Sequence, residues 1–135
     1  MFSVLDSFKP GAHWLPRIGI ASVFLFHGIG KLASVGGFAE MMGLPYPVAA
    51  LVTFAELAGG IGIIVGGFTN DLTTRLAALA MAPVLLGAIL LVHGGRWSFT
   101  PAEGYPMGGM EFQVVLLLTA LYFLIVGNST VSQSE

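Results

Sequence analysis

Charged side chains are too scarce in this chain to cover a water-soluble core. Only 9% of the 135 residues are charged, whereas 56% are hydrophobic, and an ordinary soluble domain has about 25% charged residues. The chain has no cysteine, which excludes thiolate metal sites and iron–sulfur clusters. Its five basic residues are scattered and form no patch for nucleic acid. The sequence therefore predicts a protein that contacts the lipid bilayer.

Four apolar stretches are long enough to cross a hydrocarbon core of about 30 Å, which takes roughly 20 helical residues. They cover residues 15–33, 48–68, 73–93 and 110–126. Strands with open edges do not survive in lipid, and helices joined by short loops stack up and down. We therefore predict an all-α integral membrane protein that forms an antiparallel four-helix bundle, with a single domain over residues 1–135.

Two further patterns concern how these helices pack and face. Ala58, Gly62 and Gly66 recur at every fourth position, which predicts a close contact with a neighbouring helix.

Basic residues are more frequent at the face where the first helix begins. They are Lys9, Arg17 and Arg75 there, and Lys31 and Arg96 at the opposite face. Under the positive-inside rule this bias predicts that both termini are cytoplasmic.

Ionisable side chains inside the predicted helices are the most informative residues, because each costs about 2.5 to 3.5 kcal/mol at the centre of a membrane helix. A rise of 1.5 Å per residue places Glu56 about 3 Å from the midplane. His27 and Lys31 lie one turn apart on one helix face in the same half. His93 ends the third helix and Glu111 begins the fourth, both at that face of the membrane. These five side chains are predicted to converge in one half of the bundle.

Each of these side chains also has a structural explanation. The long stem of Lys31 can extend to the lipid headgroups, and His93 and Glu111 are near helix ends, where polar residues are common. The stem of Glu56 is too short to reach water, so Glu56 is protonated, paired with His27 or Lys31, or exposed to a wet cavity. A structural ion pair and a functional acid or base both stay open.

The sequence does not favour a haem or metal site. His27 and His93 differ in depth by roughly 10 Å, whereas the axial ligands of one haem need matched positions. Together with Glu56 they are acceptable zinc or copper ligands, but no spacing points to such a site. Aromatic residues of the loops serve either as interface anchors or as a lid over a pocket for a flat amphipathic ring. They are Tyr46, Trp97, Phe99 and Tyr105.

Several short motifs occur in a fixed order along most of the chain. They include FLFHGIGKL at residues 24–32, GLP at 43–45, ELAGG at 56–60 and LVHG at 91–94. In their order and spacing they resemble the DoxX family of small four-helix bacterial membrane proteins, and the resemblance covers about residues 17–127. It implies recurring polar positions at His27, Lys31, Glu56 and Glu111, without a shared catalytic mechanism.

The resemblance also implies a redox setting, because relatives include the small membrane subunit associated with thiosulfate:quinone oxidoreductase, while many members have no assigned activity. The leading hypothesis is a subunit of a quinone-linked oxidoreductase in the bacterial inner membrane. It binds quinone or quinol at the polar site formed by His27, Lys31, Glu56, His93 and Glu111. A protein partner that carries a redox cofactor supplies the electrons.

Two other functions stay open. The chain is alternatively a membrane anchor or assembly scaffold whose polar cluster only fixes the helix register. Transport of a small solute or metal ranks last, because the other half of the bundle lacks ionisable groups apart from those near its end. Whether the chain has any activity alone, and whether it forms a homo-oligomer, does not follow from the sequence.

Overall fold

The computed structural model describes residues 2–128, and the single-domain prediction extends over residues 1 and 129–135, which lie outside the described residues. The described chain is all-α, as predicted. Its elements are α1 (Ser3–Asp6), the 3-10 helix η1 (Lys9–Gly11), α2 (Trp14–Leu32), α3 (Val35–Met42), α4 (Tyr46–Phe68), α5 (Asp71–Ala88), the π-helix η2 (Ile89–His93) and α6 (Glu111–Val126). Within residues 2–128 the only β-type contact is an isolated bridge between Ala102 and Tyr105.

The long helices differ in their ability to span a bilayer alone. Helix α4, and α5 with its continuation η2, are each long and apolar enough to cross a membrane. Helix α2 and the short α3 form a pair bent by 99°, and α6 has 16 residues. All four predicted apolar stretches are thus helical, but only two of them are full-length spans by themselves. A regular antiparallel four-helix bundle stays a prediction.

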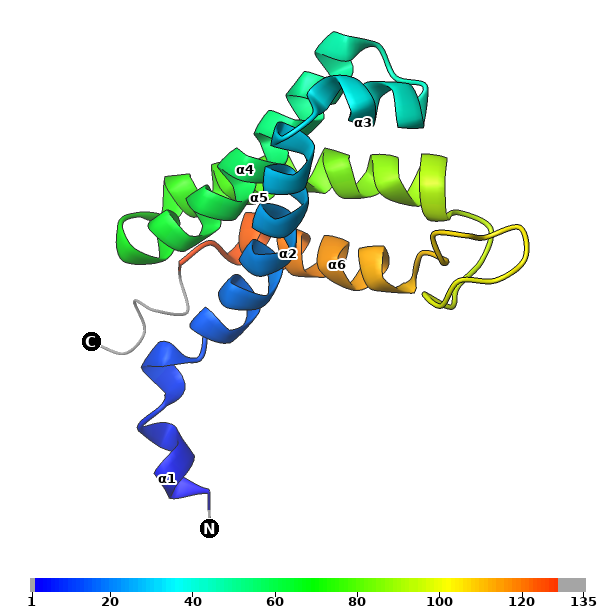
Figure 1. The fold of residues 1–135 in the computed structure, drawn as a ribbon. Coiled ribbons are helices and arrows are strands. Elements are labelled where there is room, and N and C mark those ends of the chain that lie inside the picture. The colour runs from blue at the N-terminus through cyan, green and yellow to red at the C-terminus, as the bar shows by residue number, and fades with distance from the viewer. Residues whose placement is uncertain (1, 129–135) are drawn as a thin grey trace.

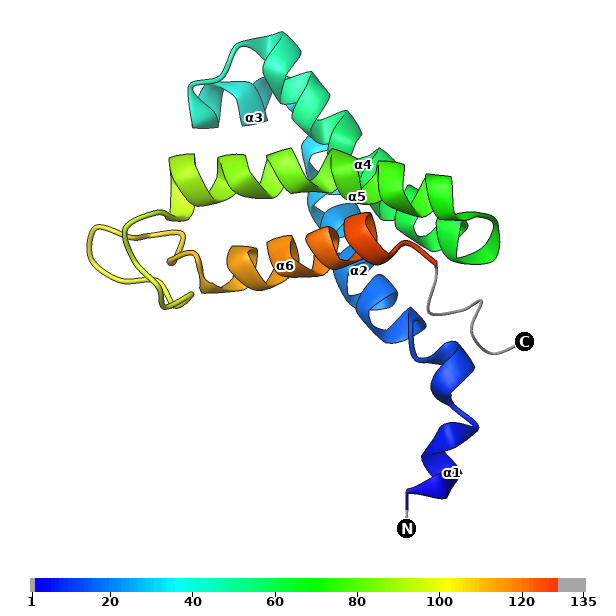
Figure 2. The same ribbon diagram turned by 180° about the vertical axis from the view of Figure 1, so that it is seen from behind.

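The helices pack in sequence order around one core. Helix α2 contacts α4, α4 contacts α5, and α5 contacts α6. Helices α5 and α6 lie side by side and are joined by the long loop 94–110, while α2 crosses in front of them (Figure 1) and is seen behind them in the opposite view (Figure 2). The first residues, including α1, extend away from the packed helices in both views.

Large apolar side chains cover the outer surface of these helices. Phe26 of α2, Phe54 of α4, Leu79 of α5 and Leu118 of α6 are each more than half exposed. A water-soluble protein rarely exposes apolar surface so continuously, because its burial is the main driving force of folding. The outer faces of α2, α4, α5 and α6 are therefore the surface that contacts the bilayer.

Small residues bring α4 and α5 close together. A Cβ atom added at Gly62 would lie 2.9 Å from the Cβ of Ala77, and one added at Gly66 would collide with Thr74. Ala58, the first residue of the predicted small-residue stripe, is half-buried. The close approach leaves no room for larger side chains at the two glycines, so substitution there must push the helices apart.

The most deeply buried charged side chain of the described residues is Arg17, whose exposed fraction is 0%. Its guanidinium donates hydrogen bonds to the Ile63 carbonyl oxygen at 2.6 Å and to Thr74 Oγ1 at 3.1 Å. It also donates to Asn128 Oδ1 at 2.5 Å and lies 4.6 Å from the ring centre of Phe123. No carboxylate within residues 2–128 forms an ion pair with it. Arg17 is thus a buried tie among helices and does not face the headgroups.

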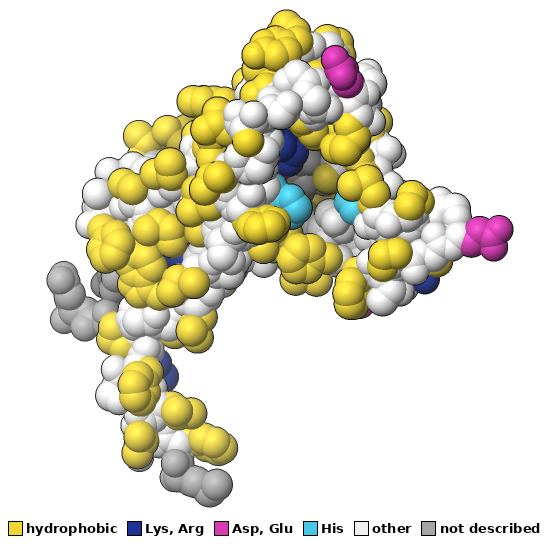
Figure 3. All heavy atoms as spheres, viewed as in Figure 1, with side chains coloured by type: hydrophobic (Ala, Val, Ile, Leu, Met, Phe, Trp, Pro, Cys, Tyr) yellow, Lys and Arg dark blue, Asp and Glu magenta, His cyan; other side chains and the backbone are white. Residues whose placement is uncertain are grey.

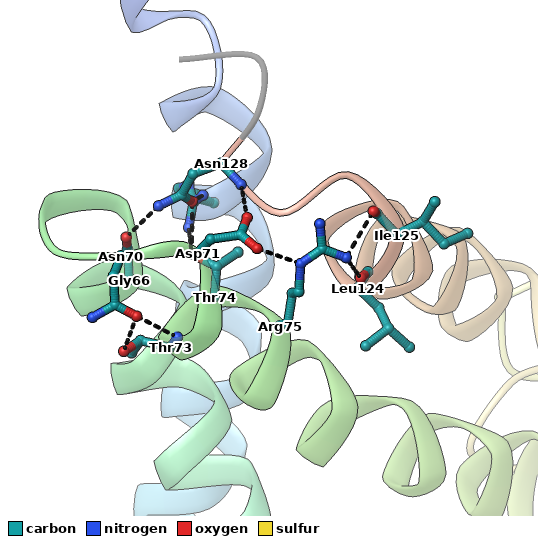
Figure 4. A network of polar contacts seen from close by, with 10 residues as sticks. Gly66, Asn70, Asp71, Thr73, Thr74, Arg75, Leu124, Ile125 and Asn128 are labelled. Carbon is teal, nitrogen blue, oxygen red and sulfur yellow. Dashed lines mark hydrogen bonds and ion pairs between the residues drawn. The ribbon is translucent and has the colours of Figure 1, made fainter. Parts of the chain in front are cut away.

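Asn128 completes this tie at the end of α6. Its backbone N–H donates to Asp71 Oδ1 at 2.7 Å and its side-chain amide donates to the Gly66 carbonyl oxygen at 2.9 Å (Figure 4). Arg75 extends the network, because it donates to Asp71 Oδ2 at 2.5 Å and to the Leu124 carbonyl oxygen at 2.8 Å. The turn between α4 and α5 is thereby fastened to the C-terminal end of α6.

Replacement of Arg17 by lysine should lower the free energy of unfolding by about 1–3 kcal/mol. An ammonium keeps the charge but cannot match the planar set of donors, so buried acceptors lose their partners. Chemical unfolding in detergent micelles, followed by far-UV circular dichroism, measures the change. Arg75→Lys is the matched control and should cost less, because Arg75 is partly exposed to solvent. Equal losses in the two variants would contradict the role assigned to Arg17.

Candidate functional site

A cavity of about 870 Å³ opens between α2, α3, α4, α5 with its continuation η2, and α6. This volume is within the usual range of about 300–1,000 Å³ for small-molecule sites. Most of its wall is apolar, with residues such as Val52, Leu85 and Phe112. Figure 3 shows the molecule hollowed on this side, with histidine and basic side chains visible in the hollow. The polar lining residues outside α3 and its flanks are His27, Lys31, Glu56, His93 and Gln113.

Close packing of α2 on α4 sets the polar wall of this cavity. A Cβ atom added at Gly28 would lie 2.9 Å from the side chain of Leu57, so glycine is what permits the short distance between the helices. His27 and Lys31 are one turn apart on α2, and Glu56 projects from α4 opposite them. The long lysine stem can therefore reach the carboxylate across the interface.

Lys31 and Glu56 form an ion pair at the cavity wall. Lys31 Nζ lies 2.5 Å from Oε1 and 2.7 Å from Oε2 of Glu56, and the side chains are only 19% and 8% exposed. The ammonium also lies 4.9 Å from the ring centre of Phe38 in α3. Lys31 thus points inward, and the pairing with Glu56 is one of the arrangements that the sequence left open. Each charge compensates the other in a region where an isolated charge is costly.

His93 lies at the end of η2, and π-helical turns are frequent at functional sites. Its Nδ1 is 3.1 Å from the carbonyl oxygen of Gly108. A carbonyl only accepts hydrogen bonds, so this contact places the proton on Nδ1 and leaves Nε2 of the neutral ring as an acceptor. His27 lines the same cavity and its ring makes an edge contact with Phe26 at 5.5 Å between centres.

Glu111 is the one predicted site residue that does not line the cavity. It begins α6, and its Oε2 accepts a hydrogen bond from the backbone N–H of Phe99 at 3.2 Å. Its own N–H donates to the Trp97 carbonyl oxygen at 2.9 Å. The structure therefore brings together His27, Lys31 and Glu56 with His93, and turns Glu111 toward the loop 94–110.

The loop aromatics considered as a lid lie away from the cavity wall. Tyr46, Trp97 and Phe99 are more than half exposed, and neither they nor Tyr105 line the cavity. The loop 94–110 contributes Met107 to the wall instead. Exposed aromatic rings at or beyond helix ends are typical of anchors at the membrane interface.

Gln113 is a lining residue that the sequence analysis missed. It lies in the first turns of α6, and its Oε1 is buried with no hydrogen-bond partner among the described residues. Gln113 is neutral, so a prediction based on ionisable groups does not include it. A glutamine inside an apolar helix is nevertheless a signal in the sequence that points to this residue. Within residues 2–128 no group of three His, Asp or Glu side chains lies close enough to hold a metal ion.

The DoxX family model matches residues 13–94. This range contains His27, Lys31, Glu56 and His93, whereas Glu111 lies beyond it. A curated protein of Bacillus subtilis (strain 168), named "Putative oxidoreductase CatD", is 30% identical to the chain over 125 residues, which make up 90% of this chain and 83% of that protein. No solved structure matches the chain significantly.

Removal of one partner of the Lys31–Glu56 pair should destabilise the protein more than removal of both. Lys31→Met and Glu56→Leu should each lower the free energy of unfolding by about 3 kcal/mol, because each leaves a buried charge unpaired. The double variant should regain most of that loss, since apolar residues of similar size can replace a buried pair. Chemical unfolding of the four proteins in detergent gives the coupling energy. Additive losses would show that the two charges do not stabilise each other.

Glu111→Ala should loosen the loop 94–110 and leave the helices intact. The substitution removes the acceptor for the Phe99 N–H, so hydrogen exchange at that amide should accelerate by about tenfold. Exchange followed by mass spectrometry measures this in the folded protein. Glu111→Gln, which keeps an acceptor oxygen, is the control and should stay close to wild type. Unchanged exchange in the alanine variant would contradict this role of Glu111.

Proposed function

This chain belongs to the DoxX family, and on that premise we propose that it is a membrane subunit of a redox complex whose cavity binds the ring of a quinone or quinol. The main support is the composition of the cavity wall. His27, the Lys31–Glu56 pair and His93 supply a few polar groups to a wall that is otherwise mostly apolar. A flat ring with two oxygens and an apolar tail matches that distribution of polar and apolar surface.

The cavity groups suit the proton chemistry of such a ring. Reduction of a quinone to its quinol takes up two electrons and two protons, and the reverse reaction releases them. Imidazole and carboxylate groups are the usual general acids and bases, and His27, Glu56 and His93 supply them at this wall. The electrons come from a partner protein that carries a redox cofactor, so the chain alone is expected to be inactive. The name of the B. subtilis relative, an oxidoreductase, is consistent with this role.

The proposal includes a location. We place the chain in the bacterial inner membrane as one multi-pass domain with both termini cytoplasmic. Arg17 and Lys31 are engaged inside the protein, so they no longer count toward the charge bias. Lys9 and Arg75 remain at the face where α2 begins, and Arg96 remains at the opposite face. The remaining bias still favours a cytoplasmic N-terminal face.

A scaffold role is the second candidate. It is favoured by the ion pair, in which Lys31 contacts both oxygens of Glu56. These contacts are what a purely structural pair requires. A scaffold recruits its partner through its outer faces, alone or as a homo-oligomer. Replacement of the cavity residues would then leave partner recruitment and the activity of the complex unchanged.

The two roles are separated by Glu56→Gln in the complete complex. The chain is first purified in mild detergent with its partner, and mass spectrometry identifies the bound proteins and lipids. Quinone-dependent electron transfer should then fall at least about tenfold in Glu56→Gln, because the amide can neither accept nor release the proton. Glu111→Gln is the matched control, since Glu111 lies outside the cavity wall. Full activity of Glu56→Gln, with the partner still bound, would reject the quinone site and favour the scaffold.

A further inference from the structure

The strongest hydrogen-bond donor of the cavity already has partners, whereas two acceptors of the cavity have none within residues 2–128. The strongest donor, the Lys31 ammonium, is engaged with both oxygens of Glu56 and lies over the ring of Phe38. Two other lining residues offer acceptors that have no partner among the described residues. The two acceptors are Gln113 Oε1 and His93 Nε2. They bear on which redox form of a ring can form hydrogen bonds with the cavity.

Gln113 presents the more costly of the two acceptors. Its side chain lines the cavity, but its Oε1 is buried and makes no hydrogen bond within residues 2–128. A buried acceptor without a partner is destabilising, because it has lost its hydrogen bonds to water and gained none within the protein. The terminal torsion of a glutamine is broad, so the amide can turn toward a donor in the cavity that its side chain lines. A ligand that brings an O–H group to Gln113 removes this penalty.

His93 supplies the second acceptor by virtue of its contact with the loop. Because Nδ1 donates to the Gly108 carbonyl oxygen at 3.1 Å, the neutral ring has an unprotonated Nε2. His27 makes no hydrogen bond to a described residue and can take either role. A quinone carries only acceptor oxygens, so it can satisfy neither Gln113 Oε1 nor His93 Nε2. A hydroquinone carries two O–H donors and matches them.

From this pattern we infer that the cavity selects the reduced, hydroxyl-bearing ring, a hydroquinone, and that Gln113 together with His93 determines the selection. The inference rests on the proposed function, in which a ring of this class occupies the cavity. It adds which redox form binds more tightly, and it adds Gln113 to the residues that recognise the ligand. The apolar remainder of the wall, which includes Val52 and Leu85, accommodates an alkyl tail.

Three probes of one shape test the selection in the unaltered protein. They are a decyl benzoquinol, the corresponding quinone and the dimethyl ether of the quinol, which keeps the oxygens and loses both donors. Isothermal titration calorimetry with the protein in lipid nanodiscs, without oxygen, gives each dissociation constant. The quinol should bind about five- to tenfold more tightly than the quinone or the ether, as expected for one buried hydrogen bond. The same quinol and quinone without the decyl tail test whether the cavity favours a lipid-soluble ligand. If it does, loss of the tail weakens binding.

Gln113→Met then tests the residue itself. Methionine has a similar length without a hydrogen-bonding amide, so quinol affinity should fall about five- to tenfold while quinone affinity stays the same. Thr119→Val is the matched control. It lies on the same helix outside the cavity, and its hydroxyl bonds only to the Val115 carbonyl oxygen. It should change neither affinity.

The outcomes separate this inference from the proposed function. Equal binding of quinol, quinone and ether would overturn the selection and leave the ring site standing. Tighter binding of the quinone would show that Gln113 donates through its N–H groups, and would also overturn it. If none of the probes binds, both the selection and the ring site are rejected. If Gln113→Met fails to fold, the comparison of the three probes in the unaltered protein still decides.

Discussion

Two cations packed between apolar helices, one fully buried and one mostly buried, impose the strictest conditions on this fold. An unpaired charge in a low-dielectric region is costly, so each must find compensation within the protein. Lys31 obtains it from one carboxylate, Glu56, which binds its ammonium through both oxygens. Arg17 obtains it from neutral groups, namely carbonyl, hydroxyl and amide oxygens and the ring of Phe123. The first solution joins α2 to α4, and the second joins α2 to α4, α5 and the end of α6.

These two solutions give the two ends of the protein different properties. The Arg17 and Asn128 contacts engage polar groups of α2, α4, α5 and the chain after α6, so that end is tied together by hydrogen bonds. The Lys31–Glu56 pair joins only α2 and α4, and a cavity opens beside the pair, with α3, α5, η2 and α6 contributing the other walls. A hydrogen-bonded end beside an open polar end is a suitable arrangement for a binding site, because it holds the helices that form the site without filling it.

The sequence predicted the helices well because lipid makes apolar length decisive, and it placed Lys31 and Glu56 in the same half of the bundle because depth follows from residue count. The sequence could not predict toward which side of a helix each side chain points. This explains the remaining differences between the prediction and the structure. Arg17 has the position of a headgroup anchor, yet it faces the core. The residue count places Glu111 at the same membrane depth as the cavity, but its side chain points to the loop 94–110. Gln113 is uncharged, and its significance appears only when its oxygen is seen to lack a partner.

The loop 94–110 illustrates how chemistry can depend on residues that have no reactive group. The acceptor character of His93 follows from the position of the Gly108 carbonyl, and Gly108 has φ +75°, a conformation that favours glycine. A side chain there would also collide with the backbone of Phe99, whose N–H is held by Glu111. The Gly108 carbonyl that contacts His93 thus belongs to a loop segment that packs on Phe99, whose N–H in turn donates to Glu111. Glu111 holds this loop through its acceptor oxygen, which Glu111→Gln retains, and it does not line the cavity.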